Sequence, residues 1–332
     1  MNLLSLAEQL SGNEEAAVQF DARRCLHHGD KLSGCDACYE VCPEGAIEPG
    51  RPPTVEGEAC RFCRACLPVC PTGAYAMEDE APDLMHCAAR LEQSAPERYG
   101  FEIICQHHPR PQYGPDAAAI RIRGCLAGLG AAAYVQLSTL SADHITIRTD
   151  ACEGCPWSQL AEQIEQQLEE ANGFLQPWFQ RPALNRYAVA DEDEHRRRPA
   201  YSAHSPPVSR RSLFRFGAEP EPEREALADG FHPFRERMRL LSALPALPAY
   251  EREAAAETVM PGPGYATLTV SEACSACGTC ARACPSGALE LCLDEDAQRF
   301  ALDFSLQACL ACGASVDLCP EEAIELHPAP TV

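Results

Sequence analysis

Lysine is almost absent from this chain, and positive charge in general is scarce. Lys31 is the only lysine, and 27 lysine and arginine residues stand against 49 acidic ones, so the formal net charge is −22. Proteins that bind nucleic acid neutralise phosphates with clustered cationic side chains, and this balance argues against such a partner. An acidic surface instead favours docking to basic patches on other proteins.

Long apolar segments are missing as well. The sequence has no run of 18 apolar residues, so we expect no membrane span, and residues 1–19 have neither the basic start nor the apolar core of a signal peptide. We therefore expect a cytoplasmic protein, in which thiols stay reduced. Gly-x-Gly-x-x-Gly and Walker sequences are also absent, so flavin or nucleotide chemistry would need a partner subunit.

Cysteine, by contrast, is abundant, with 21 residues. Most of them belong to four copies of one pattern, each of which ends in Cys-Pro. The copies comprise Cys35, Cys38 and Cys42; Cys60, Cys63, Cys66 and Cys70; Cys274, Cys277, Cys280 and Cys284; and Cys309, Cys312 and Cys319. Thiolates spaced as Cys-x2-Cys-x2-Cys-x3-Cys-Pro hold [4Fe–4S] clusters, which pass single electrons. Zinc ribbons also use Cys-x2-Cys pairs, but four Cys-Pro endings in one chain favour iron–sulfur clusters.

The repeat extends beyond the cysteines. Strand-like alternation precedes the later copies, as in residues 265–270 and 300–304, and a short helix and a second strand are predicted after each cysteine loop. Cys292, on the strand after the third copy, is predicted to be a buried thiol. With these features, residues 20–80 and 263–328 resemble the bacterial two-cluster ferredoxins. The resemblance implies two α+β ferredoxin modules, in each of which two units pack around two clusters.

In the ferredoxin family, the fourth cysteine of one motif binds the cluster of the other motif. Carried over to this chain, the resemblance implies four ligand sets. They are Cys25, Cys35 and Cys38 with Cys70; Cys60, Cys63 and Cys66 with Cys42; Cys274, Cys277 and Cys280 with Cys319; and Cys309 and Cys312, with Ser315 in the third position, together with Cys284.

The first copy lacks its leading cysteine, because Leu32 stands at the expected position. Cys25 is the nearest substitute, and the insert 26–34 is long enough to loop out and let Cys25 supply the missing thiolate. His27 and His28 are the alternative ligands, although we expect them to be solvated loop residues.

The fourth copy has Ser315 at its third ligand position. Serine is a poor iron ligand at neutral pH because its hydroxyl must lose a proton to bind well. Two outcomes remain open: a [3Fe–4S] cluster on Cys309, Cys312 and Cys284, or a [4Fe–4S] cluster whose last iron is held weakly by Ser315, water or Asp317. Either outcome would shift the reduction potential.

Between the two ferredoxin modules, strands and helices are predicted to alternate. The strands cover residues 101–105, 119–123 and 144–148, and the helices cover residues 126–140 and 157–172. This βαβα order implies a central α/β module with a small parallel sheet and covering helices.

Four cysteines of the central segment follow the predicted strands: Cys105, Cys125, Cys152 and Cys155. Because the carboxyl ends of parallel strands meet at one edge of a sheet, these thiols are expected to converge on a site for a [2Fe–2S] cluster or zinc. The segment resembles the iron–sulfur delta subunit of methyl-viologen-reducing hydrogenases, in which strand-end cysteines and a Gly-Cys element hold a [2Fe–2S] centre. It lacks the long Gly-Cys-His signature of that family, and the alternative is a set of buried, redox-inert thiols.

The patterns divide the chain into an N-terminal ferredoxin domain, a central domain, a connector and a C-terminal ferredoxin domain, at 1–80, 81–190, 191–262 and 263–332. The connector combines a basic segment at 209–216, proline-rich turns and one amphipathic helix at 234–244. It is either a solvated linker or a docking segment in which Phe214 and Phe216 are apolar anchors.

Together the patterns indicate a multi-cluster electron carrier with three or four [4Fe–4S] clusters. Its partner would be a larger oxidoreductase or another electron carrier, and the chain itself is expected to be an electron-transfer subunit more than an enzyme. Two alternatives remain open. One is a redox enzyme that acts on a sulfur substrate at the central cysteines, and the other is a cluster-based redox sensor or assembly factor.

Overall fold

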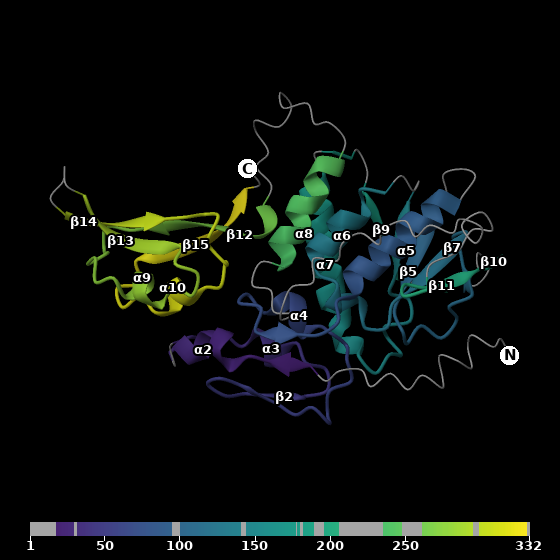
Figure 1. The fold of residues 1–332 in the computed structure, drawn as a ribbon, viewed down its shortest axis with the longest axis horizontal. Coiled ribbons are helices and arrows are strands. Elements are labelled where there is room, and N and C mark those ends of the chain that lie inside the picture. The colour runs from purple at the N-terminus through teal and green to yellow at the C-terminus, as the bar shows by residue number, and fades with distance from the viewer. Residues whose placement is uncertain are drawn as a thin grey trace, which may run out of the picture.

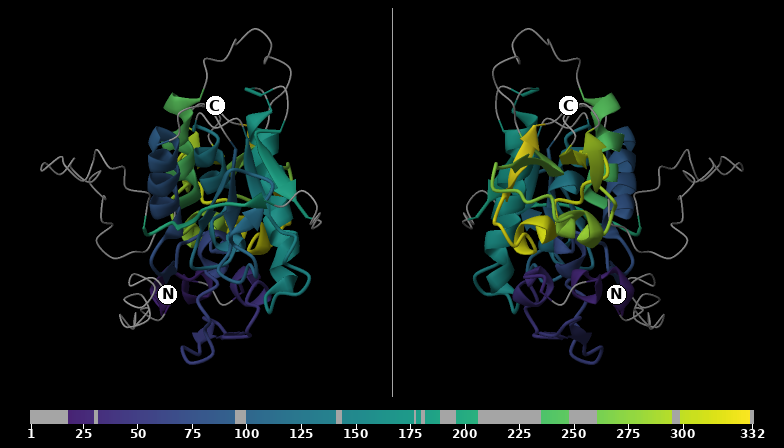
Figure 2. Two further views of the ribbon diagram at one scale, coloured as in Figure 1. Left: turned by 90° about the vertical axis from the view of Figure 1, so that its right-hand side faces the viewer. Right: turned by 90° about the vertical axis from the view of Figure 1, so that its left-hand side faces the viewer.

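The computed structural model describes residues 18–29, 32–94, 100–140, 144–176, 178–179, 182–188, 196–205, 235–247, 261–294 and 299–330. A central α/β module carries two smaller α+β modules, one from each end of the described chain (Figure 1). Both views in Figure 2 place the N-terminal module below the central one. This arrangement confirms the predicted fold class. None of the described helices is long and apolar enough to cross a membrane.

The N-terminal module consists of two short antiparallel pairs and the helices between them. The pairs are β1 (Gln19–Phe20) with β4 (Tyr75–Ala76), and β2 (Ile47–Glu48) with β3 (Thr54–Val55). The helices are η1 (Ala22–Arg24), α2 (Leu26–Gly29), α3 (Ala37–Glu40) and α4 (Cys66–Val69). Its apolar core is small and is formed by Val18, Ile47, Leu67 and Tyr75. So small a core supplies little stability through hydrophobic burial.

The C-terminal module repeats this plan with longer strands. It contains β12 (Pro261–Val270) paired with β15 (Ile324–Pro330), β13 (Leu289–Asp294) paired with β14 (Arg299–Phe304), and the helices α9 (Thr279–Ala283) and α10 (Ala314–Asp317). The predicted strands at 265–270 and 300–304 are therefore present.

The prediction of a buried thiol at Cys292 is wrong, because this residue is exposed on β13. Its neighbours on the β13–β14 ladder, Leu293 and Phe300, are cross-strand partners that are 53% and 57% exposed. Cys292 shares its face of β13 with exposed Glu290, whereas Leu289 on the opposite face is 4% exposed and belongs to the core of the module.

The central sheet has five parallel strands in the order β11-β7-β5-β8-β9. Their bounds are β5 (Phe101–Ile104), β7 (Ala118–Arg121), β8 (Ile145–Arg148), β9 (Leu184–Tyr187) and β11 (Ala200–Ser202). One face packs into the main apolar core with α5 (Glu80–Ser94), α6 (Ala131–Leu137) and α7 (Ala161–Leu175). The strands predicted at 101–105, 119–123 and 144–148 correspond to β5, β7 and β8.

Two strand pairings of the central module had no signal in the sequence. Strand β11 comes from residues beyond 190 and pairs in parallel with β7, and β10 (Arg196–Arg197) pairs antiparallel with β6 (Tyr113–Gly114) in a separate two-stranded sheet. The helix predicted at 126–140 is interrupted: η2 (Leu126–Gly128) ends before Gly130, whose φ of 83° breaks the helix, and α6 follows. The Glu236 carboxylate accepts the Ala132 N–H at 2.9 Å and so caps α6.

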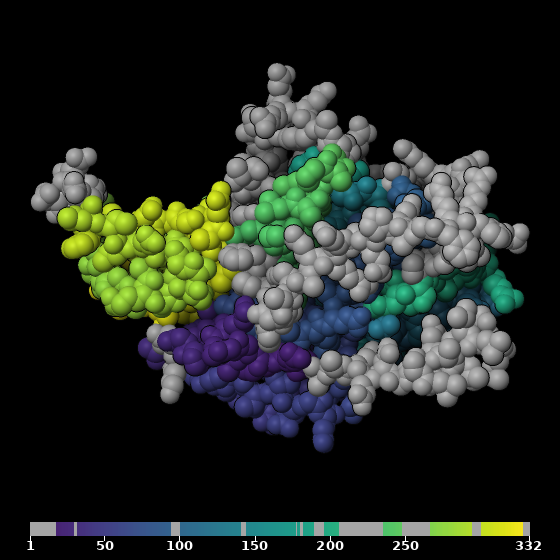
Figure 3. Space-filling model, in the orientation of Figure 1, coloured from purple at the N-terminus to yellow at the C-terminus, as the bar shows by residue number. Residues whose placement is uncertain are grey.

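Helix α8 (Arg235–Ala243) lies close to the position predicted at 234–244 and is packed into the molecule. It contacts α6 and lies beside both β12 and the central module (Figure 3). Its side chains Arg235, Arg237 and Arg239 are each less than a tenth exposed. The basic segment at 209–216, with Phe214 and Phe216, lies outside the described residues.

The same turn follows the last cysteine of each copy. In each, the third residue after the cysteine donates its N–H to the cysteine carbonyl, at 3.2–3.4 Å. Gly45, Gly73 and Gly287 occupy this left-handed position in three copies, but Glu322, with φ of 48°, occupies it in the fourth. A left-handed conformation costs a residue with a side chain roughly 1–2 kcal/mol.

Glu322→Gly should therefore stabilise the C-terminal module by about 1 kcal/mol, since glycine relieves the strain but adds entropy to the unfolded chain. The measurement is the midpoint of anaerobic guanidinium unfolding of the cluster-loaded protein. Glu321→Gly is the matched control, because Glu321 is equally exposed and lacks a positive φ; it should lower the midpoint or leave it unchanged. Equal midpoints for Glu322→Gly and the parent protein would contradict the expectation.

Candidate metal centres

The cysteine loops have a backbone shape that follows directly from their spacing. In the second, third and fourth copies, the residue on each side of the second cysteine has a positive φ. The pairs are Phe62 and Arg64, Ala276 and Gly278, and Ala311 and Gly313. Alternation of right-handed and left-handed residues points successive N–H groups toward one centre, which suits a ligand with negatively charged sulfur atoms.

The last cysteine of a copy is oriented by its own turn. Ala74, Ala288 and Ala323 each donate a backbone N–H to the thiol sulfur four residues earlier, on Cys70, Cys284 and Cys319 respectively, at 3.2–3.3 Å. Hydrogen bonds to sulfur ligands help to set the reduction potential of a cluster. The repeated sequence therefore repeats one structural feature, a hydrogen bond from a backbone N–H to the sulfur of the last cysteine.

Site A comprises Cys25, Cys35, Cys38 and Cys70. The thiol of Cys25, between η1 and α2, interacts electrostatically with that of Cys70, and the thiols of Cys35 and Cys38 interact with both. Burial is the main cause that raises the pKa of Cys35 to about 11. The structure therefore brings together the four thiols that the ferredoxin resemblance implies, with Cys25 among them. Their role as ligands of one cluster stays a prediction.

The alternative ligands of the first copy differ in their surroundings. His28 is exposed, whereas His27 is 4% exposed and its Nε2 lies 2.6 Å from the carbonyl oxygen of Cys35. The prediction that both histidines are solvated is wrong for His27. Its contact fixes the loop that carries Cys35 next to the helix that follows Cys25.

Site B comprises Cys42, Cys60, Cys63 and Cys66. The thiols of Cys63 and Cys66 interact electrostatically with each other and with those of Cys42 and Cys60. Burial raises the pKa of Cys63 to about 11 and that of Cys66 well above its usual value. A buried thiol keeps its proton until a metal ion replaces it, so these positions suit iron better than free thiolate.

Site D comprises Cys274, Cys277, Cys280 and Cys319. The thiol of Cys280 interacts with those of Cys274 and Cys277, and Cys319 packs against the same small core as Cys280. Cys277 is exposed, and hydrogen bonds that involve Thr279 are the main cause that lowers its pKa.

Site E comprises Cys284, Cys309, Cys312 and Ser315. All four line one small cavity, and the Cys312 thiol interacts with those of Cys284 and Cys309. Asp317, the other candidate oxygen ligand, points elsewhere: its Oδ2 accepts the backbone N–H of Gly34 at 2.9 Å. The geometry therefore favours Ser315 or water over Asp317 at the fourth corner.

Site C comprises the four central cysteines, Cys105, Cys125, Cys152 and Cys155. They follow β5, β7 and β8, which are neighbours in the sheet order β7-β5-β8. The thiols of Cys125 and Cys152 both interact with that of Cys105, and Cys152 also interacts with Cys155. Burial raises the pKa of Cys152 to about 12. The expected convergence at one sheet edge is present, and the identity of a bound group stays a prediction.

A buried ionic network supports the loop of site C from the face of the sheet opposite the helices. Arg148 donates to both carboxylate oxygens of Asp150, at 2.6 Å each, and to Glu102 at 2.5 Å, while Arg198 also binds Glu102. Although burial acts to raise the pKa of Asp150, hydrogen bonds from Arg148 hold it well below its usual range, and His108, whose Nε2 lies 3.6 Å from Asp150 Oδ1, lowers it further. The pairing anchors the residues just before Cys152.

Comparison with known proteins supports the two ferredoxin modules. The family profile of the 4Fe-4S dicluster domain matches residues 31–74 and 273–323. The chain carries 4Fe-4S dicluster domains at both of its ends. No curated protein and no solved structure matches the chain significantly, and the resemblance of the central module to the hydrogenase delta subunit gains no support.

The match to the N-terminal dicluster domain begins at residue 31, after Cys25. This boundary has a physical reason, since the insert separates Cys25 from the regular motif. The structure, not the family pattern, brings the Cys25 thiol next to Cys70.

The N-terminal dicluster domain is in direct contact with site C. The backbone N–H of Cys125 donates to the carbonyl of Cys63 at 3.2 Å, and the Cys125 thiol interacts with that of Cys63. A Cβ atom on Gly128 would lie 2.7 Å from the Cβ of Arg64, so this approach requires glycine. Trp157 Nε1 donates to the Glu44 carboxylate at 2.6 Å across the same contact. Sequence reasoning missed this contact because it joins residues far apart in the chain.

Cys25→Ser tests the assignment of site A. If Cys25 completes this site, the variant should lose or convert one cluster of the N-terminal dicluster domain while the others keep their signals in electron paramagnetic resonance (EPR) spectra. Cys292→Ser is the control, because this exposed thiol lies in no site, and its iron content should equal that of the parent protein. An unchanged iron count in Cys25→Ser would place the ligand elsewhere, and buried His27 would be substituted next.

Proposed function

We propose that the chain is a multi-cluster electron-transfer protein in which site C is connected to the two dicluster domains. The observation that carries this proposal is the contact between Cys63 of site B and Cys125 of site C, at 3.2 Å between backbone atoms. Through this contact, site B, whose cysteines have the spacing of a [4Fe–4S] ligand set, is the direct neighbour of the four thiols of site C. Neighbouring redox centres suit electron transfer, whereas isolated structural metal sites need no such contact.

Contacts between the two dicluster domains support an ordered path. Gly34, next to Cys35 of site A, binds Asp317 of the C-terminal domain. Cys70 of site A lines a cavity of about 300 Å³ together with Leu310 and Ala311, which lie between the cysteines of site E. The contacts favour the order D, E, A, B, C.

The residues at the two ends of this order are accessible. Cys277 of site D is exposed, and Glu153 and Gly154, between the last two cysteines of site C, are exposed as well. Cys125, at the junction of sites B and C, is buried and unsuited to contact with a partner. We propose that a larger oxidoreductase or another carrier docks at one or both ends.

The chain's own residues fit the proposed groups. Four thiols at sites A, B and D suit [4Fe–4S] clusters, three thiols and Ser315 at site E suit a [3Fe–4S] or a labile [4Fe–4S] cluster, and site C suits a [2Fe–2S] cluster or zinc. Bound clusters would supply reversible one-electron chemistry. The protein buries the thiols, donates N–H groups to them and fixes their spacing. The many reduced thiols suit a reducing compartment such as the cytoplasm.

Iron content and electron uptake test the proposed function. Anaerobically prepared protein should carry roughly 15–16 iron atoms at sites A, B, D and E, counted at four irons per cubane. Reductive titration followed by EPR should then show one electron taken up per cluster. A well-folded protein that contains zinc in place of iron and takes up no electrons would overturn the proposal. Turnover of a sulfur substrate by the isolated protein would favour an enzyme instead.

Ser315→Cys tests the finer structure of site E. The serine hydroxyl ionises far less readily than a thiol, whose ordinary pKa is about 8.5, so the corner iron should be the most labile of the chain. Mild oxidation should give a three-iron EPR signal from this site first, and Ser315→Cys should abolish that signal. Asp317→Asn is the control, since its carboxylate binds Gly34. A parent protein with no three-iron signal and an unaltered spectrum in Ser315→Cys would show that Ser315 is not at the corner.

A further inference from the structure

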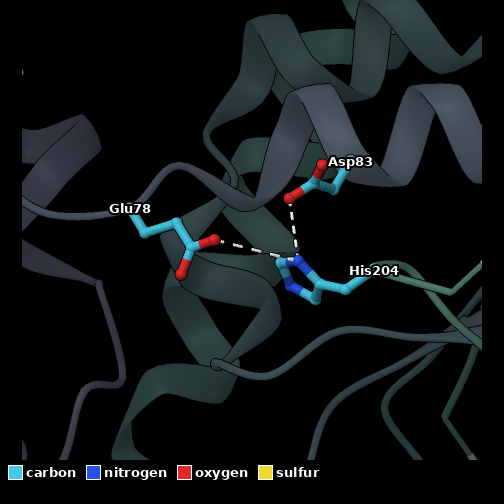
Figure 4. Close-up of side chains that lie close together, drawn as sticks. All are labelled: Glu78, Asp83 and His204. Carbon is cyan, nitrogen blue, oxygen red and sulfur yellow. Dashed lines mark ion pairs between the residues drawn. The ribbon is translucent and has the colours of Figure 1, made fainter. Parts of the chain in front are cut away.

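One histidine lies between three carboxylates at the junction of the N-terminal and central modules. His204 Nδ1 is 2.8 Å from Asp83 Oδ2 and 3.9 Å from Glu78 Oε1, and Figure 4 shows both carboxylates directed at the same edge of the ring. The three potential ligand atoms lie within 4.8 Å of one another. His204 and Asp83 are largely buried, and Glu78 is half exposed.

The opposite ring nitrogen is held separately. His204 Nε2 lies 3.2 Å from Glu80 Oε2, and the Glu80 side chain is only 3% exposed. Glu80 is fixed in turn by the Arg64 guanidinium at 3.2 Å and by the backbone N–H of Arg123 at 3.0 Å. Metal-binding histidines characteristically donate their second ring N–H to a carboxylate, which orients the ring and raises the basicity of the ligating nitrogen. Glu80 provides this support independently of the three ligand atoms.

We propose that Glu78, Asp83 and His204 bind a divalent first-row transition-metal ion, with water in the remaining coordination positions. One imidazole nitrogen with two carboxylate oxygens is a set that Mn²⁺, Fe²⁺ and Zn²⁺ accept. With metal–ligand bonds of about 2.0–2.2 Å, ligand atoms lie roughly 3–3.5 Å apart. The observed separations of 2.8 and 3.9 Å fall on either side of this range, so the ion requires small side-chain shifts.

The ion would join two segments that are distant in the sequence, residues 78–83 and the segment around His204. Glu78 follows β4 of the N-terminal module, Asp83 lies in the first turns of α5, and His204 follows β11 of the central sheet. Glu80 connects the site to Arg64, which lies between Cys63 and Cys66 of site B. The half-exposed Glu78 gives the ion a route from solvent. The ion would therefore clamp the N-terminal dicluster domain to the central module beside site B, whatever the clusters themselves do.

The test measures Mn²⁺ binding to the oxidised, cluster-loaded protein by equilibrium dialysis at moderate salt. Mn²⁺ is the probe because it prefers oxygen and nitrogen to thiolate, so it does not report on cysteine sites as Zn²⁺ would. The parent protein should bind one Mn²⁺ per chain, and one equivalent of Zn²⁺ should displace it. His204→Gln and Asp83→Asn should lose this binding, and Glu80→Gln should weaken it by about 10- to 100-fold.

His144→Gln is the matched control. His144 also pairs with a carboxylate, since its Nε2 lies 2.6 Å from Asp116, but no third ligand joins this pair among the described residues; its Mn²⁺ binding should equal that of the parent protein. Iron content and circular dichroism verify folding, and Glu78→Gln at a half-exposed position decides the question if His204→Gln does not fold. No bound Mn²⁺ in the parent protein, or equal binding in the parent protein and in Asp83→Asn or Glu78→Gln, would overturn the proposal and leave an ion-pair cluster without metal.

Discussion

The relative position of the modules depends on buried arginines of helix α8. Arg237 donates to the carbonyl oxygens of Gln307 and Cys309 in the C-terminal module. Arg239 binds Asp79, where the chain leaves the N-terminal module, and the Leu129 carbonyl of the central module. A buried guanidinium is tolerated only when it is paired and hydrogen-bonded. Moving the C-terminal or the central module away would leave buried N–H donors without acceptors, and moving the N-terminal module away would take the Asp79 carboxylate from Arg239. The proposed electron path requires a fixed junction of this kind, because electron transfer weakens steeply with distance.

The cost of burying an unpaired charge also applies to the cysteine thiols inside the sites. Burial raises the pKa of thiols such as Cys35, Cys63 and Cys152, so these groups are stable as neutral thiols or as metal-bound thiolates, and not as free anions. Backbone N–H groups of the turns that follow the last cysteines donate to the sulfur atoms, as at Cys70 and Cys284. Both dicluster domains have small apolar cores, so we expect metal bound at these sites to contribute to their stability.

The spacing of residues in the sequence predicted the features that depend on short stretches of the chain. The cysteine loops repeat because their backbone alternation is a property of a few consecutive residues, and Cys105, Cys125 and Cys152 converge because parallel strands end at one edge. Contacts between segments that are distant in the chain leave no pattern in the sequence, so they were not predicted. The helix at α8 was predicted, but its arginines gave no indication that they are buried, and β11 and His204 lay in a segment that resembled a connector. Whether a histidine, a charged helix or a strand pair is buried depends on the segments that pack against it. Alternation and composition carry no information about those segments.

The first and fourth cysteine motifs, which both depart from the ferredoxin pattern, are in contact with each other. The first copy has its leading cysteine displaced to Cys25, and the fourth has Ser315 in place of cysteine. Gly34, in the segment that follows the displaced cysteine, donates to Asp317, in the helix that carries Ser315. A regular first motif would have a cysteine ligand at position 32, close to Gly34. In this chain the loop around Gly34 instead contacts the C-terminal module. The departures from the ferredoxin pattern therefore coincide with the surface on which the two dicluster domains join. An isolated dicluster ferredoxin has no such surface, so its pattern alone cannot account for either departure.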